Sequence, residues 1–212
     1  MATETGEQPA GAAPIPAITP PEGTAARVLD AAFSRFAAQG IKATTMAQLA
    51  EGAGISRVWL YRHFANKDAV VAALLVRESN RFQAGLLVLV QDTRPAAEVV
   101  TDAFVQSVTT LRSHPVLRRI LDNEPEVVGQ YVVNGIGPLL RLAIDGIAAY
   151  LSVNGAGAEP EMVAETLVRL VVFALLNNDT TVDYDDPAAL RRYAAVTVRS
   201  LLAEPELRRR HR

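Results

Sequence analysis

Apolar side chains recur at intervals of three and four residues along most of the chain, which is the spacing of an amphipathic α-helix. The first such stretch runs from Thr24 to Gln39. Further helices are predicted at 67–90, 95–112, 116–121, 124–133, 138–153, 161–178 and 187–202. No alternation of apolar and polar residues is long enough to predict a strand. The pattern therefore predicts an all-α protein.

Residues 44–67 predict two short helices joined by a tight turn. Thr45 and Gln48 have the spacing of a capping box at the start of the first of these helices. Gly54 is expected in the turn, because a residue without a Cβ atom adopts a left-handed backbone at little cost. Ser56 is expected to cap the second helix. The local pattern is that of a helix-turn-helix, with the helix that begins at Thr24 behind it.

The second short helix has an inward side and an outward side. Leu60 and Phe64 are four residues apart and share the face that packs on the first short helix. The side chains turned outward to varying degrees are Arg57, Val58, Trp59, Tyr61 and Arg62. Such a row favours a DNA partner, because the second helix of a helix-turn-helix lies in the major groove. Helical bundles that bind no DNA contain the same geometry, so plain packing is the alternative.

Seven residues are predicted to contact DNA. Arg57 is placed for a bidentate contact with guanine, and Val58 and Trp59 for contacts with thymine methyl groups or sugars. The predicted phosphate contacts come from Tyr61, His63, Thr45 and Lys67. The last two of these lie at helix N-termini, where the helix dipole favours an anion.

Residues 24–75 resemble the N-terminal domain of the TetR family of bacterial transcriptional repressors in both order and spacing. The resemblance is carried by the stretch RVLDAAFSRFAAQGIKATTMAQLAEGAGISRVWLYRHFANKDAVVAAL. The matching positions are Phe33, Phe36, Gly40, Thr44, Thr45, Leu49, Ala50, Ala53, Gly54, Ile55, Ser56, Leu60, Tyr61, His63, Phe64 and Lys67. The resemblance implies an all-helical homodimer that binds a palindromic operator and releases it when a small molecule enters the C-terminal domain. Trp59 departs from the family, which usually has a small residue there.

Four segments are expected along the chain. Residues 1–23, rich in Pro, Ala and Gly, are predicted to be a disordered N-terminal arm. Residues 24–66 are predicted to be the three-helix DNA-binding domain. Residues 67–204 are predicted to form a helical ligand-binding and dimerisation domain, whose first helix connects it to the DNA-binding domain. Residues 205–212 are predicted to be a basic tail.

The distribution of charge supports this division. The whole chain has a formal net charge of −2. Residues 24–78 nevertheless hold seven Lys or Arg against four acids, whereas residues 79–212 hold fourteen against sixteen. The basic excess therefore lies on the part predicted to bind DNA.

The two last predicted helices offer more apolar area than one covering helix needs, which favours a four-helix interface between two subunits. The predicted interface residues are Leu167, Val171, Ala174, Tyr193, Thr197 and Leu201. Packing of these residues within a single subunit is the alternative.

A small-molecule cavity is expected among the middle helices, since effector pockets are mostly apolar with a few polar groups. The predicted lining residues are Phe104, Leu121, Tyr131, Leu139, Phe173 and Asn177. Each of them also fits an ordinary core position. The predicted cavity region contains no cationic cluster, which favours a neutral and fairly apolar effector.

The sequence argues against enzyme, metal-binding and membrane functions. There is no cysteine, no metal-ligand spacing and no glycine-rich phosphate loop, and His114 precedes a proline at a helix start. We therefore expect no catalytic residue, cofactor or metal. No apolar run is long enough to span a membrane and no secretory signal is evident, so a cytoplasmic location is expected. The alternative function is a helical protein-interaction module that uses the same N-terminal helices without an operator.

Overall fold

The computed structural model describes residues 23–89, 94–124, 126–127, 137–156, 159–177 and 180–203. Every regular element within these residues is a helix, which confirms the all-α prediction. In chain order the helices are α1 (Thr24–Ala43), α2 (Met46–Gly52), α3 (Arg57–His63), α4 (Lys67–Leu87), α5 (Ala96–Ser113), α6 (Pro115–Asn123), α8 (Gly137–Val153), α9 (Pro160–Leu176) and α10 (Pro187–Leu202). None of these helices is long and apolar enough to cross a membrane.

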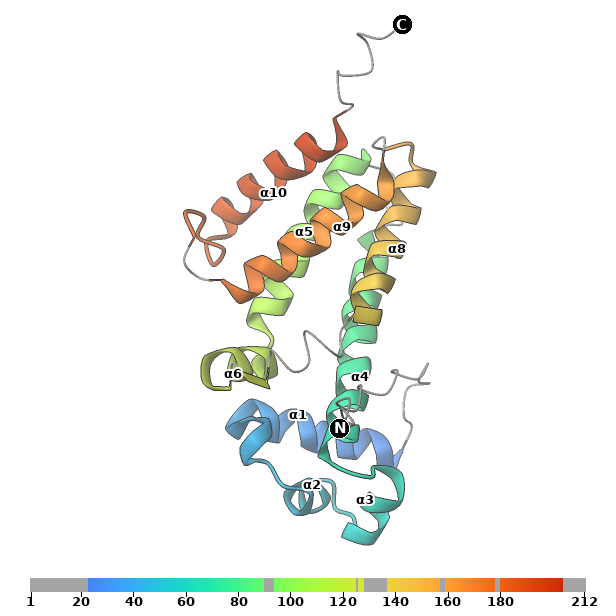
Figure 1. Cartoon of the computed structure of the whole chain (residues 1–212), viewed down its shortest axis with the longest axis vertical. Helices are drawn as coiled ribbons and strands as arrows, with labels where there is room; N and C mark the ends of the chain where they lie inside the picture. The colour runs from blue at the N-terminus through green and yellow to red at the C-terminus, as the bar shows by residue number, and fades with distance from the viewer. Residues whose placement is uncertain are drawn as a thin grey trace, which may run out of the picture.

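Helices α1, α2 and α3 form a small head at one end of the molecule (Figure 1). Phe36 of α1, Leu49 of α2 and Leu60 of α3 are completely buried at its centre. Burial of side chains of this size stabilises the folded state by about 1.5–3 kcal/mol each. The apolar face of α1 thus holds the two shorter helices from behind, as its sequence pattern predicts.

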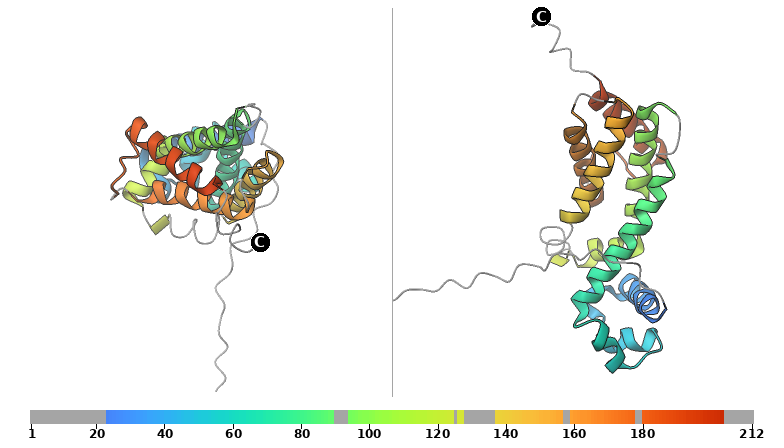
Figure 2. Two further views of the ribbon diagram at one scale, coloured as in Figure 1. Left: turned by 90° about the horizontal axis from the view of Figure 1, so that it is seen from above. Right: turned by 90° about the vertical axis from the view of Figure 1, so that its right-hand side faces the viewer.

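Helix α4 runs from the head towards the other helices, and the right-hand view of Figure 2 shows it extending away from the head. Arg77 in this helix is buried and donates hydrogen bonds to Asp30 Oδ1 at 2.6 Å and to the Leu29 carbonyl oxygen at 3.2 Å. These bonds fix the middle of α4 to α1.

Helices α5, α8, α9 and α10 form the body (Figure 1). Helix α8 packs mainly on α9, while α10 packs mainly on α5 and touches α9 little. The body core contains Phe104, Leu151, Leu167, Leu190 and Val198.

Helix α6 belongs to the head core although it follows α5 in the chain. Val116 and Ile120 of α6, with Val127 beyond it, join the cluster of buried residues of α1, α2 and α3. Helix α1 packs more extensively on α6 than on α2 or α4. The division expected after residue 66 therefore does not coincide with the division between the two cores.

The predicted helix ends agree with the structure to within three residues in most cases. Helix α10 has the predicted bounds, and prolines begin α6, α9 and α10 because proline lacks the amide hydrogen that the first turn leaves unpaired. Helix α1 extends beyond Gln39 to Ala43 across a break at Gly40. The predictions that concern residues outside the described ranges are those for positions 1–22 of the N-terminal arm, the tail 205–212, Tyr131 and most of the helix 124–133.

Candidate nucleic-acid interface

Local hydrogen bonds set the geometry of the helix-turn-helix. The Thr45 hydroxyl accepts from the amide of Gln48 and the Gln48 side chain accepts from the amide of Thr45, so the predicted capping box is confirmed. Gly54 has φ +64°, the left-handed conformation predicted for the turn. The Ser56 hydroxyl accepts from the amide of Trp59 and caps α3 as expected. The sequence thus specifies how the chain enters each short helix.

Helix α3 presents a polar and partly apolar surface opposite its anchoring residue Leu60. Val58 and Arg62 are one helical turn apart on the side away from Leu60, and Val58 is 73% exposed. Arg57 and Tyr61 form a second such pair on one edge, with Tyr61 54% exposed. Within the described residues, neither the guanidinium of Arg57 nor that of Arg62 has an intramolecular partner. Two free cations and two exposed apolar groups therefore face outward together.

Trp59 and His63 lie on the other edge of α3. Their rings stack with centroids 3.7 Å apart and planes 13° apart, and the indole is partly buried against the head core. His63 Nδ1 is 3.0 Å from the Trp59 carbonyl oxygen, which can only accept, so Nδ1 carries a proton. In neutral His63 the remaining nitrogen is then an acceptor. A hydrogen bond from that nitrogen to a phosphate requires the protonated ring.

Thr45 is the N-cap of α2 and Lys67 is the first residue of α4, but only Thr45 is exposed. Lys67 Nζ donates to the carbonyl oxygens of Ile41 at 2.7 Å, Lys42 at 3.2 Å and Thr44 at 2.9 Å. An ammonium group has three protons, so these acceptors occupy all of them. The geometry gives Lys67 a role inside the head, and its predicted phosphate contact stays a prediction.

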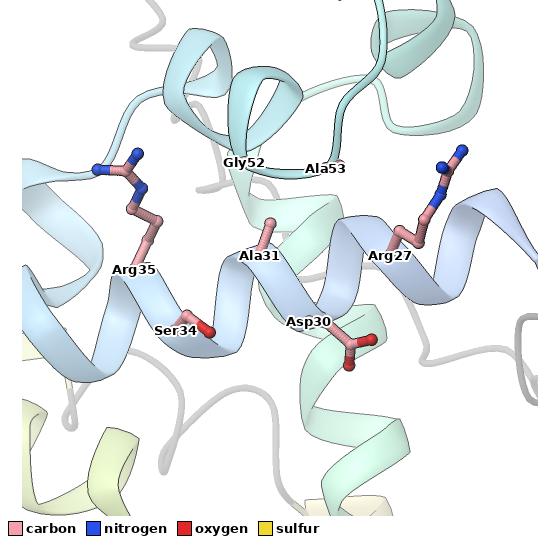
Figure 3. Close-up of a pocket in the computed structure, with 7 residues that line it drawn as sticks. All are labelled: Arg27, Asp30, Ala31, Ser34, Arg35, Gly52 and Ala53. Carbon is pink, nitrogen blue, oxygen red and sulfur yellow. The ribbon is translucent and has the colours of Figure 1, made fainter.

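A hollow of about 310 Å³ lies between α1 and α2, beside the helix-turn-helix. Figure 3 shows Arg27 and Arg35 at its two ends, extending on the side of α1 that faces α2, whereas Asp30 and Ser34 extend on the other side. Sequence periodicity did not single out these arginines. They add positive charge on the α2 side of the head.

The structure does not bring together those predicted cavity residues that it describes. Phe104 is 3% exposed within the body core, where its ring contacts Tyr193, and Leu139 is half-buried on α8. Phe173 is 51% exposed on α9, and its place in a cavity stays a prediction. Asn177 caps the end of α9. Helical periodicity identifies apolar faces, but it does not say which faces surround the same space.

One predicted lining residue, Leu121, borders a hollow of about 810 Å³ between α6 and the body. Its lining residues are Thr109, Arg112, Ser113, Arg118, Leu121, Asp122, Leu175, Leu176, Thr180, Thr181, Val182, Asp183, Tyr184, Asp185, Pro187 and Leu190. Polar side chains outnumber apolar ones in this lining. The hollow is therefore more polar than the sequence suggests.

The ion pair between Arg112 and Asp185 forms part of the lining of this hollow. Arg112 donates from Nε to Asp185 Oδ1 at 3.0 Å, from Nη2 to Oδ2 at 2.7 Å, and from Nη1 to the Ala174 carbonyl oxygen at 2.9 Å. The hydrogen bonds from Arg112 hold the pKa of the Asp185 carboxyl below its usual value. Burial raises the pKa of the neighbouring Tyr184 hydroxyl. The pair joins α5 to the segment before α10.

The residues predicted to form a dimer interface are used within the subunit. Leu167 is 3% exposed and Ala174 is completely buried, while Val171, Tyr193 and Leu201 pack against the same body core. Thr197 is half-buried. Leu167 and Ala174 are therefore core residues of the subunit, whereas the predicted pairing of the last two helices across a dimer stays a prediction.

Exposed apolar residues gather instead on α8 and α9, which pack against each other. Leu142 and Val153 are eleven residues apart on α8, and Met162 and Phe173 are eleven apart on α9, so each pair lies on one face about three turns apart. Leu176 extends the row on α9. The exposed fractions of these five side chains range from 44% to 86%. The described part of the subunit leaves these two apolar rows uncovered.

Comparison with known proteins places the head in a family. The model of the family described as "Bacterial regulatory proteins, tetR family" matches residues 28–74, which run from α1 into α4. An uncharacterized helix-turn-helix transcriptional regulator of Mycobacterium tuberculosis is 28% identical over 151 residues, covering 71% of this chain and 72% of its own. The repressor KstR2 of the same species is 33% identical over 87 residues, covering 41% and 44% of the two chains.

The fold is similar to that of solved regulators over most of the chain. The crystal structure of a TetR-family transcriptional regulator from Pectobacterium atrosepticum matches with a TM-score of 0.65 and 20% sequence identity. The match covers 86% of this chain and 96% of the other. At this identity the likeness establishes the fold of head and body together.

Proposed function

Because the chain belongs to the TetR family of bacterial transcriptional regulators, we propose that it is a ligand-responsive repressor that binds a palindromic operator as a homodimer. The homologues are regulators and not enzymes. The operator, the dimer and the effector are parts of the proposal, and each is supported by a different surface of the subunit.

The observation that carries the DNA proposal is the outward surface of α3. A major groove admits one α-helix, and guanine offers two acceptors to a guanidinium such as that of Arg57. Val58 and Tyr61 are exposed enough to reach thymine methyl groups and the backbone. Arg62 adds a cation whose charge suits a phosphate. Thr45, exposed at the N-cap of α2, is the proposed contact for a further phosphate.

Trp59 takes a different role in this proposal from the exposed residues of α3. Its ring is held between His63 and the head core, so its contact with DNA is confined to the edge of the helix. We propose that Trp59 contacts sugar and backbone at the groove wall, with base readout left to Arg57 and Val58.

The exposed face of α8 and α9 is the proposed dimer interface. Two copies related by a twofold axis would each contribute both helices, and the four helices would cover both apolar faces. For the two recognition helices to enter successive major grooves, they must lie about 34–36 Å apart or a multiple of it.

The hollow of about 810 Å³ is the proposed effector site. Its volume lies within the range of about 300–1,000 Å³ for small-molecule pockets. Leu121, Leu175 and Leu190 supply apolar contacts, while the hydroxyl groups of Thr109 and Thr181 and the guanidinium of Arg118 supply polar ones. We propose a small organic effector with several hydrogen-bonding groups.

Selection of bound fragments from a pool of random duplexes tests the DNA proposal. A palindromic product would support a homodimer on an operator, and its half-site spacing would give the separation of the heads. Affinity for the product should fall steeply with salt, with a log–log slope of about −0.9 per neutralised phosphate. A protein-interaction module would select no sequence and show no such slope.

Arg57→Ala tests the assigned base contact on the selected duplex. Loss of a bidentate contact should cost about 1–3 kcal/mol on the operator and leave binding to random duplex nearly unchanged. Arg199→Ala, which removes an exposed arginine from α10 in the body, is the matched control. Equal losses on both duplexes for Arg57→Ala would contradict its role in base readout.

A further inference from the structure

The turn that joins α1 to α2 is held by the carboxylate of Glu124, the residue directly after α6. At Gly40 the backbone leaves the helix, with φ +87° and ψ +170°. The amides of Ile41 and Lys42 follow this break and donate to Glu124, at 3.0 Å to Oε2 and 3.1 Å to Oε1 respectively. Two backbone donors that the broken helix leaves unpaired are therefore satisfied from a residue more than eighty positions away.

The same turn is held on its other side by α4. Lys67 donates to the carbonyl oxygens of Ile41, Lys42 and Thr44, while Glu124 accepts from amides of the same turn. The negative charge of Glu124 lies against backbone amides, and the positive charge of Lys67 lies against backbone carbonyl oxygens. Each charge therefore meets the end of the peptide dipole that it attracts. The turn directly precedes Thr45, which caps α2.

The fit around Glu124 is close. The residue is 6% exposed, and a buried carboxylate is costly unless hydrogen bonds compensate for lost water. A Cβ atom on Gly40 would overlap the Glu124 carboxylate, and the positive φ at this position disfavours other residues. Gly40 and Glu124 therefore form one closely packed joint between α1 and the end of α6.

Helix α6 faces the proposed effector site on its other side. Arg118, Leu121 and Asp122 line the hollow of about 810 Å³, whereas Val116 and Ile120 lie in the head core. The remaining lining residues belong to α5, α9, α10 and the segment before α10, which are parts of the body. The hollow thus lies on the boundary between the two cores, with α6 on the head side.

We infer that Glu124 is a positioning residue for DNA binding: its carboxylate holds the turn before α2 against the end of α6 and so fixes the position of the head. This inference rests on the proposed function, because the position of the head matters for the protein only if the head binds DNA.

The test compares Glu124→Gln with Glu126→Gln in the full chain. The first substitution keeps the size of the side chain but replaces an acceptor oxygen with an amide that cannot accept. The second removes the charge of an exposed carboxylate that pairs with Lys42 on the same turn. Both variants therefore remove one negative charge near the turn. Only Glu124→Gln disturbs the buried joint between Gly40 and Glu124.

Spin labels report the position of the head. The chain has no cysteine, so Glu51→Cys on α2 and Ser200→Cys on α10, both exposed, place one label on the head and one on the body. Labelled subunits are diluted with unlabelled ones, so that each dimer carries at most one labelled copy. The distance distribution is measured by pulsed electron resonance, after circular dichroism has shown that each variant is fully folded.

The expected result is a broadened or shifted distance distribution for Glu124→Gln and a wild-type distribution for Glu126→Gln. Affinity for the selected duplex should fall about tenfold for Glu124→Gln, as expected for a lost hydrogen bond to a charged group, and by no more than about twofold for Glu126→Gln. A purely structural role would lower thermal stability without changing the distances in the folded state.

An unchanged distance distribution in folded Glu124→Gln would overturn the positioning role, whatever the DNA result. If wild-type protein selected no duplex while the distances still changed, the proposed function would fail and the joint between α6 and the head would stand. Equal changes in both variants would also overturn the inference, because a general loss of charge would then explain them.

Discussion

Lys67 illustrates how a single residue can match a functional motif and yet have a structural task. Its position at the start of α4 suggests a phosphate contact, but its three protons are directed to three carbonyl oxygens at the end of α1. Those oxygens lose a charged donor if the ammonium is removed. The side chain therefore ties α4 to the turn that precedes α2.

Lys67→Met keeps the aliphatic stem and removes the charge. We expect the free energy of unfolding to fall by about 1–3 kcal/mol, since the hydrogen bonds involve a charged donor. Urea titration followed by circular dichroism measures this loss. Arg62→Ala on α3, an exposed cation without a partner in the described head, should change stability by no more than about 0.5 kcal/mol. A urea midpoint for Lys67→Met equal to that of the wild type would contradict this expectation, because water would then satisfy the three carbonyl oxygens as well as the ammonium does.

At the scale of an element, α6 depends on a histidine at its start. His114 Nδ1 accepts from the Leu117 amide at 3.3 Å and caps the helix, and its ring meets the edge of Phe33 from α1. Nε2 is 3.7 Å from Glu78 of α4. Burial lowers the pKa of His114 below its usual value, and Glu78 offsets this effect only in part. The neutral ring is thus part of the junction between α1, α4 and α6.

The direction of the pH dependence follows from this lowered pKa. Above the ordinary histidine pKa of about 6.5 neither the folded nor the unfolded state is protonated at His114. As the pH falls below that value, the unfolded chain binds a proton that the folded chain does not, so the free energy of unfolding decreases. His114→Asn retains an oxygen that can cap α6 but does not titrate. We expect its stability to fall less steeply between about pH 7 and pH 5, measured by urea titrations at several pH values; parallel curves would contradict this account.

At the scale of the whole molecule, the two exposed apolar rows on α8 and α9 set the expected assembly. Phe173→Glu places a charge in the exposed apolar row of α9 and should shift dimers to monomers, because an unpaired charge in an apolar interface is costly. Sedimentation equilibrium measures the shift. Val196→Glu is the matched control, since Val196 is 58% exposed on α10, where the sequence alone had suggested the interface. If Val196→Glu dissociated the dimer and Phe173→Glu did not, the interface would lie on α10.

The sequence predicted the head well because its determinants are local. Thr45 and Gln48, Gly54 and Ser56 act over one helical turn or less, and Leu60 identifies the buried side of α3 through simple periodicity. The body was predicted only as a set of helices. Its apolar faces are wide, and periodicity does not decide which neighbour covers each of them. The sequence therefore did not show that Leu167 is buried in the body core while Phe173 is exposed on the described subunit.

By itself the sequence determined the all-helical fold, most helix ends and the outward row of α3, since each depends on residues within a few positions of one another. Only the tertiary structure decided that α10 covers α5, that α6 joins the head core, and that Glu124 holds the turn after Gly40. Glu124 and Ile41 are 83 positions apart, as Arg112 and Asp185 are 73 apart. Such pairs leave no periodic signal in the chain, because their separation is set by how the helices pack.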